Sequence, residues 1–126
     1  MTTSSKLLDL RGVTDDERNA RLNEAVAVIA GEPHVRRVTD YSRLHVEVGE
    51  YPDTLRVTYA TSCDAVMPLL EKYAWRATAY AEGISVRFST QVGVNGIAFY
   101  ADTLAPTLAL AFCIALLRAN GIKVLV

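Results

Sequence analysis

The sequence predicts an α+β domain in which antiparallel sheet packs with three helices, in the order α-β-β-(β)-α-β-β-β-α. Two observations predict this class. A phrase of strand, Tyr-Ala, capping residues and helix occurs twice, around Tyr59 and around Tyr100. Between the helical segments lie short segments of alternating polar and apolar residues, which is the pattern of half-buried strands. Turn-forming Gly, Pro and Asn residues separate those segments, as they do in hairpins.

The first helix is predicted from about residue 14. Thr14-Asp15-Asp16-Glu17 forms a capping box, in which the Thr14 hydroxyl accepts from the third helical N–H and Glu17 reaches back. One apolar stripe follows at three- and four-residue spacing: Leu22, Ala25, Val26 and Ile29. Gly31 is expected to end the helix in the left-handed conformation. Residues 1–12 are expected to form a polar lead-in, and residues 13–126 a single α+β domain.

Alternation predicts strands at residues 44–48 and 55–59, with a hairpin connection through Gly49 to Asp53 and a candidate edge strand at 35–38. A helix is expected over 62–73. Because Pro68 removes an N–H there, this helix either begins nearer Asp64 or is kinked in its first turns.

Three more strands are predicted at 75–80, at 84–89 after the Glu82-Gly83 turn, and at 97–100 after Asn95-Gly96. The last helix is expected to be capped by Asp102 or Thr103 and to end at Gly121. It is apolar around nearly its whole circumference, so it should be a central helix or lie at a subunit interface. A short strand at 122–126 is expected to close the chain.

Composition narrows the function. The 126 residues suffice for one core, and the net charge of −1 gives no general attraction to nucleic acid or anionic lipid. The order α-β-β-β-α is shared with double-stranded-RNA-binding domains, but the start of the last helix carries no lysine, which argues against that function. We find neither a signal peptide nor an apolar run long enough to span a bilayer, so we expect no membrane association and a cytoplasmic location.

Reactive side chains are few. Cys63 lies near a predicted helix N-terminus, and His45 or His34 could serve as its base, which keeps a minor Cys/His enzyme open. No local cysteine-enzyme signature surrounds Cys63, so we interpret it, like Cys113, as a packing or capping residue. The two Cys and two His lack the spacing of metal-ligand pairs. We therefore expect no metal, no cofactor and no catalytic residues.

The best candidate for binding is the polar face of the central hairpin. It carries Arg76, Thr78 and Tyr80 beside Ser85, Arg87 and Ser89, with Tyr100 on the next strand. Arginine and tyrosine combine stacking area with directional hydrogen bonds and are enriched in binding hot spots. The alternative is a sheet face that is merely solvated, or that is covered by the first helix. The high apolar fraction, 51%, further predicts a homodimer formed through apolar surface.

Three segments resemble the phage α-β-α sandwich domain family, a family of small phage and prophage accessory proteins. They are residues 21–27, 59–67 and 101–119, and with the strands between them they cover most of 20–120. The resemblance implies a phage or prophage protein and brings no catalytic residues. We therefore expect a non-catalytic accessory protein that binds a host protein in the host cytoplasm, for example an inhibitor of antiviral defence such as an anti-CRISPR. The alternative is a protein that sequesters a nucleotide-like small ligand through Arg76, Tyr80, Arg87 and Tyr100.

Overall fold

The structure, a computed structural model, describes residues 7–41, 43–71, 73–92 and 96–126, and only the backbone path of 89–92 and 96–102. The elements are β1 (Leu7–Asp9), α1 (Asp15–Ile29), β2 (Arg36–Asp40), β3 (Arg43–Val48), β4 (Leu55–Val57), α2 (Cys63–Val66), a 3₁₀ turn (Met67–Leu70), β5 (Ala74–Tyr80), β6 (Gly83–Val92), β7 (Gly96–Ala105), α3 (Leu108–Ala119) and β8 (Lys123–Leu125). The predicted α+β class is confirmed.

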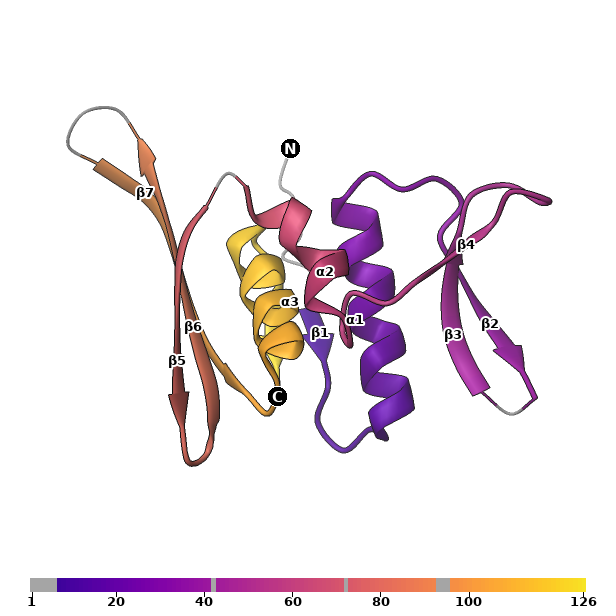
Figure 1. Ribbon diagram of the computed structural model, residues 1–126, viewed down its shortest axis with the longest axis horizontal. Helices are drawn as coiled ribbons and strands as arrows, with labels where there is room; N and C mark the ends of the chain where they lie inside the picture. Colours follow the sequence, from indigo (N-terminus) through magenta and orange to yellow (C-terminus); the bar gives the residue numbers. More distant parts are fainter. Residues whose placement is uncertain (1–6, 42, 72, 93–95) are drawn as a thin grey trace.

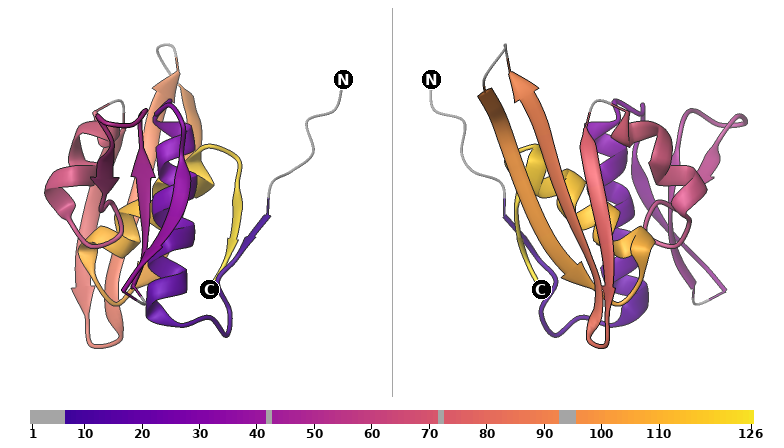
Figure 2. Two further views of the ribbon diagram at one scale, coloured as in Figure 1. Left: turned by 90° about the vertical axis from the view of Figure 1, so that its right-hand side faces the viewer. Right: turned by 60° about the vertical axis from the view of Figure 1, so that its left-hand side comes forward.

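The elements form four layers. The antiparallel sheets β5-β6-β7 and β2-β3-β4 lie on the outside, and α3 and α1 lie between them (Figure 1). α3 packs on β6 and β7, α1 packs on β3, and the two helices pack on each other. α2 lies beside the helices, as does the parallel pair of β1 and β8 (Figure 2). Each sheet therefore turns one face to a helix and the other away from the core.

The core is built around α3. Its buried residues include Phe112, Ile114, Leu116 and Leu117. The Phe112 ring lies 6.3 Å from that of Phe88 on β6, and Phe88 stacks on Tyr73 at 5.1 Å. Burying each large apolar side chain contributes about 1.5–3 kcal/mol. The expectation of a central helix is confirmed within a single chain.

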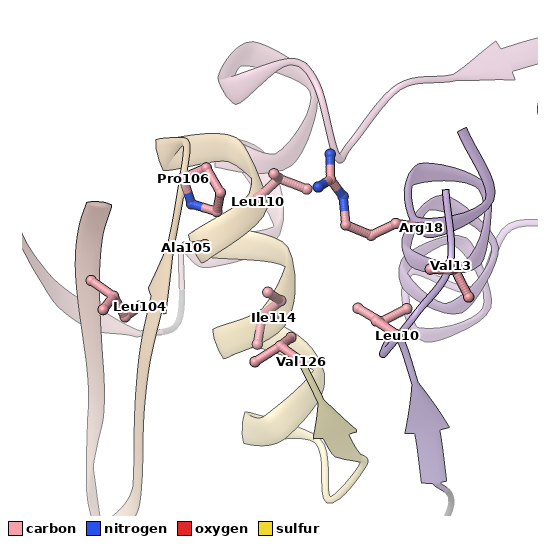
Figure 3. A pocket seen from close by; sticks show the side chains of 9 residues that line it. All are labelled: Leu10, Val13, Arg18, Leu104, Ala105, Pro106, Leu110, Ile114 and Val126. Carbon is pink, nitrogen blue, oxygen red and sulfur yellow. The ribbon is translucent and has the colours of Figure 1, made fainter. Parts of the chain in front are cut away.

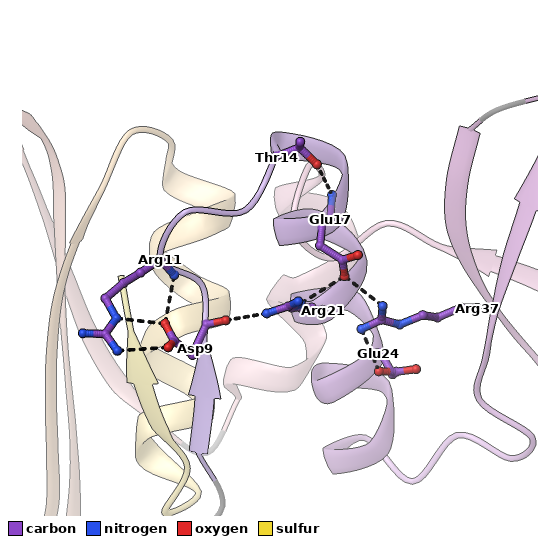
Figure 4. Close-up of polar contacts among 7 residues, drawn as sticks. All are labelled: Asp9, Arg11, Thr14, Glu17, Arg21, Glu24 and Arg37. Atoms are coloured by element: carbon purple, nitrogen blue, oxygen red, sulfur yellow. Dashed lines mark hydrogen bonds and ion pairs between the residues drawn. The ribbon is translucent and has the colours of Figure 1, made fainter.

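A network of charged side chains fastens α1 to its neighbours (Figure 4). The Thr14 hydroxyl accepts from the Glu17 N–H at 3.2 Å, as the capping box predicts. The Glu17 carboxylate accepts from Arg21 at 3.0 Å and from Arg37 of β2 at 2.8 Å. Arg21 also donates to the backbone oxygen of Asp9, at 2.7 Å. The hydrogen bond from Arg21, helped by Arg37, holds the pKa of Glu17 below its usual range.

The expected lead-in differs in its second half. Leu7 to Asp9 form β1, which pairs in parallel with β8, and Leu10 is buried in the core. The partner strand lies at the other end of the chain, so no local pattern could indicate this pairing. The closing strand predicted over 122–126 is confirmed as β8.

The predicted helix over 62–73 is wrong in length. The α-helix stops at Val66 and continues as a 3₁₀ turn, because Pro68 has no N–H to donate back into a longer α-helix. Ser62 caps its start, accepting from the N–H of Ala65 at 3.3 Å. Of the two alternatives predicted from Pro68, the structure therefore shows the one in which the first turns are disturbed.

The start of the last helix is also corrected. Asp102 and Thr103 are strand residues, since β7 continues along β6 to Ala105. Pro106 then ends the pairing because it has no N–H for a sheet ladder. The cap is Thr107, whose hydroxyl accepts from the Leu110 N–H at 3.2 Å. The turn predicted at Asn95-Gly96 lies outside the described residues.

Candidate binding face

The β5–β6–β7 sheet separates the core from the candidate face. Val86 and Phe88 on β6 are buried against α3. Residues opposite one another in an antiparallel ladder lie on the same face of the sheet. The register therefore places the following residues on the face that points away from α3, here called the outer face: Arg76, Thr78, Tyr80, Ser85, Arg87 and Leu104.

Within the described residues, no helix covers the outer face. α3 lies against the opposite face of the sheet, and α1 lies beyond α3 (Figures 1 and 2). The alternative in which the first helix covers this face is thus excluded. Arg76, Thr78 and Arg87 are exposed, and Ser85 is half-buried. The structure brings these four predicted residues together with Tyr80.

The face combines cationic and apolar groups. Arg76 and Arg87 are directly opposite each other in the ladder, although like charges in that position repel. Tyr80 is 57% exposed and Leu104 48% exposed. The register also sets Asp102 opposite Arg87, and Arg87 already has a partner within the chain, so a carboxylate or phosphate of a binding partner would accept hydrogen bonds first from Arg76. The arrangement suits a partner that has acidic groups next to an apolar contact.

Tyr100 and Leu104 change the set of residues predicted for the binding face. The ladder pairs Tyr100 with Ser89, but both side chains lie outside the described residues. Leu104 was missed, because the sequence assigned it to the last helix. The signal that could have placed it on the strand is the Pro106-Thr107 pair, a strand terminator followed by a good helix cap.

A hollow of about 440 Å³ lies where the outer face approaches the β5–β6 turn. It is lined by Tyr80, Ser85, Thr103, Leu104 and Arg118. Thr103 is only 5% exposed, and its Oγ1 atom has no hydrogen-bond partner among the described residues. An unsatisfied buried hydroxyl costs about 1–3 kcal/mol. The hollow thus offers the Tyr80 ring to a small ligand, whereas the Thr103 hydroxyl is closed off from solvent on the α3 side of the sheet, opposite Val86.

Cys63 lies elsewhere, in a hollow of about 290 Å³ between α1 and the start of α3. Its lining includes Arg18, Thr61 and Thr107, but neither histidine. Cys113 is buried in α3, and burial raises the pKa of its thiol far above the usual range. The packing role predicted for Cys113 is confirmed.

Both histidines belong to the other sheet and its loops. His45 Nε2 lies 2.7 Å from Glu47 Oε2 on β3, and His34 Nε2 lies 2.9 Å from Glu50 Oε1. The hydrogen bond from His45 lowers the pKa of Glu47. These contacts give each imidazole a carboxylate partner, so the geometry does not assemble a Cys63–His pair in the Cys63 hollow. The described residues contain no group of three or more His, Cys, Asp or Glu side chains that could hold a metal ion.

An apolar hollow of about 220 Å³ opens between α3 and the start of α1 (Figure 3). It is lined by Leu10, Val13, Arg18, Leu104, Ala105, Pro106, Leu110, Ile114 and Val126. The Arg18 guanidinium is 3.3 Å from Asp15. This volume is below the roughly 300 Å³ at which small-molecule sites begin, so we favour the outer face as the candidate site.

No protein-family model matches the chain, and no curated protein is significantly similar to it. Across the described ranges, none of the helices has the length and apolar character needed to cross a membrane.

Proposed function

We propose that this chain is a non-catalytic binding protein whose outer face engages an acidic surface of a host protein. The observation that carries the proposal is the exposed pair Arg76 and Arg87, flanked by Tyr80 and Leu104, on a sheet face that no described helix covers. Arginine and tyrosine anchors at the centre of a patch supply most of the affinity in protein complexes. Neither guanidinium is needed to seal the core, which lies on the opposite face.

The proposal includes a phage or prophage origin and action in the host cytoplasm, as an accessory protein that inhibits antiviral defence. Two sheets enclose two helices here, so this origin is supported by the sequence resemblance and not by the order of the layers. The segments that carry the resemblance fall on α1, at the start of α2, and across the end of β7 into α3.

The test begins with capture of partners from a bacterial host lysate by the tagged chain and identification of any stoichiometric protein. The purified partner is then titrated against wild type, the double variant Arg76→Ala/Arg87→Ala and the control Arg56→Ala. Arg56 is exposed on the other sheet. We expect the double variant to bind at least about 30-fold more weakly and the control to bind like wild type. Equal affinities for all three proteins would refute the proposal.

The hollow beside Tyr80 favours a second candidate, a protein that sequesters a nucleotide-like ligand there. The aromatic ring gives a base a stacking surface. Native mass spectrometry of freshly purified protein is expected to show an added small mass, which Tyr80→Ala reduces. A bare chain in both samples would contradict this candidate.

A further inference from the structure

Among the strands that the structure describes, β5 is an unpaired edge of its sheet. The strand order is β5-β6-β7, so β5 has one strand neighbour, and every residue from Ala74 to Tyr80 is exposed. An edge strand presents free N–H and C=O groups to any strand of suitable shape. Proteins usually block such edges with lysine, proline or a bulge. Within β5, Arg76 is the only charged residue, and the β5–β6 register runs without a shift.

The face of β5 that points toward α3 is also incompletely covered. Ala77 lies opposite the fully buried Val86, so both are on the α3 side of the sheet. Ala77 and Ala79 are nevertheless exposed. The rings of Trp75 and Phe112 form a T-shaped pair with centroids 4.9 Å apart, but Trp75 remains 41% exposed. α3 therefore covers β6 and leaves an uncovered apolar shelf beneath β5.

We propose that a second copy of this chain pairs with β5 in antiparallel orientation, on a two-fold axis that passes beside Ala77. This register sets Trp75 opposite the partner's Ala79, Arg76 opposite the partner's Thr78, and Tyr80 opposite the partner's Ala74. Every large side chain meets a small one, so the strand is complementary to itself. The partner's Trp75 comes to lie on the shelf at Ala79.

Repulsion between the two copies of Arg76 favours the same register. Centring the pair on Arg76 would set two guanidinium groups directly opposite each other, which is unfavourable. Centring it on Ala77 sets each guanidinium opposite a neutral hydroxyl. The whole chain carries a net charge of only −1, so two copies repel each other weakly.

The area of contact predicts a weak dimer. At the exposures of Trp75 and Tyr80, the four aromatic side chains bury together on the order of 400 Å². A specific interface needs about 1,000 Å² in total, so the other exposed residues of the two strands must supply the larger share. We expect a dissociation constant on the order of 10–100 µM. The dimer extends beyond the proposed function, because it adds a contact along the edge of β5 that partly covers Tyr80 of the outer face and Trp75 of the α3 side.

Disulfide trapping tests the register. On the proposed axis Ala77 faces its own copy, with Cα atoms about 4.5–5.5 Å apart, within the range that a disulfide bridges. Ala77→Cys is therefore expected to form a covalent dimer under mild oxidation. Ala79→Cys is the matched control, because position 79 in the two copies is separated by about 13 Å along the strands. Wild type controls for Cys63 and Cys113. Equal cross-linking of Ala77→Cys and Ala79→Cys would overturn the proposed register.

Sedimentation analysis of two charge variants provides an independent readout. Thr78→Glu sets a carboxylate opposite the partner's Arg76 and is expected to tighten the dimer about threefold to tenfold. Thr78→Arg sets like charges opposite and is expected to weaken it at least tenfold. The same changes at Thr39, exposed on β2 of the other sheet, should have no effect. A wild-type chain that stays monomeric to about 1 mM, or a response to charge that does not depend on its sign, would overturn the proposal.

Discussion

Asn23 is the buried polar residue whose replacement tests the packing of α1 most sharply. It is 7% exposed, and its Oδ1 accepts a hydrogen bond from the backbone N–H of Ala60 at 2.8 Å. Ala60 lies in the Tyr-Ala-Thr-Ser phrase that precedes α2 and is itself buried. The bond thus fixes the path of the chain between the β2–β4 sheet and α2.

The variant Asn23→Ala leaves that N–H without its acceptor, which costs about 1–3 kcal/mol. Alanine recovers roughly 0.5 kcal/mol of helix propensity. We therefore expect a net loss of about 0.5–2.5 kcal/mol in the free energy of unfolding. For a chain of this size that corresponds to a fall of roughly 5 °C in the thermal midpoint.

The assay is urea unfolding followed by circular dichroism, with Asn19→Ala as control. Asn19 lies one turn earlier on α1 and accepts from the neighbouring Arg18 at 3.3 Å, so the control has the same change in propensity without the buried bond. A difference between the two variants of less than about 0.3 kcal/mol, within the usual scatter of surface substitutions, would refute the reasoning.

Three further predictions concern stability. The pKa of Glu17 is lowered in the folded state, so its pairing with Arg21 and Arg37 stabilises the fold fully above the ordinary pKa of 4.5, and this stabilisation is lost as the pH falls through the folded pKa. In urea titrations Glu17→Gln should therefore lose less stability than wild type between pH 7 and about pH 3. The same dependence of stability on pH in both proteins would contradict this. Thr107→Ala should lower the free energy of unfolding by about 1 kcal/mol. The loss should exceed that of the control Thr61→Ala, because the Thr61 hydroxyl makes only a 3.4 Å contact. Equal losses would contradict the assignment of Thr107 as the helix cap. Gly83 has a φ of 149° and an added Cβ would meet the Ala105 oxygen at 2.6 Å, so Gly83→Ala should lower the thermal midpoint by several degrees, and an unchanged midpoint would count against this turn geometry.

Features specified by neighbouring residues could be predicted from the sequence. The Thr14–Glu17 cap, the β3–β4 hairpin and the polar alternation of β5 each depend on residues within a few positions of one another. The composition of the outer face followed from that alternation, because side chains two apart on a strand share a face. The exposure of the outer face could not be predicted from the alternation, because it depends on where α1 packs.

Features that depend on distant partners could not be predicted. β1 exists because β8 pairs with it from the other end of the chain, and its three residues carry no distinct strand pattern. The predicted start of the last helix lies too early in the sequence. Asp102 and Thr103 have side chains that cap helices well, but both residues pair with β6 as part of a strand. Leu104 lies on the outer face because of the same pairing of β7 with β6. Tertiary contacts overrode local preference at both places.

The most direct test of the binding face is chemical-shift mapping of the isotope-labelled chain with its captured partner. The outer face predicts that the largest shifts of backbone amides fall on Arg76, Thr78, Arg87 and Leu104, with β2 to β4 unaffected. Shifts that gather on the β2–β4 sheet and leave β5 to β7 unchanged would contradict the assignment of the outer face as the site of binding.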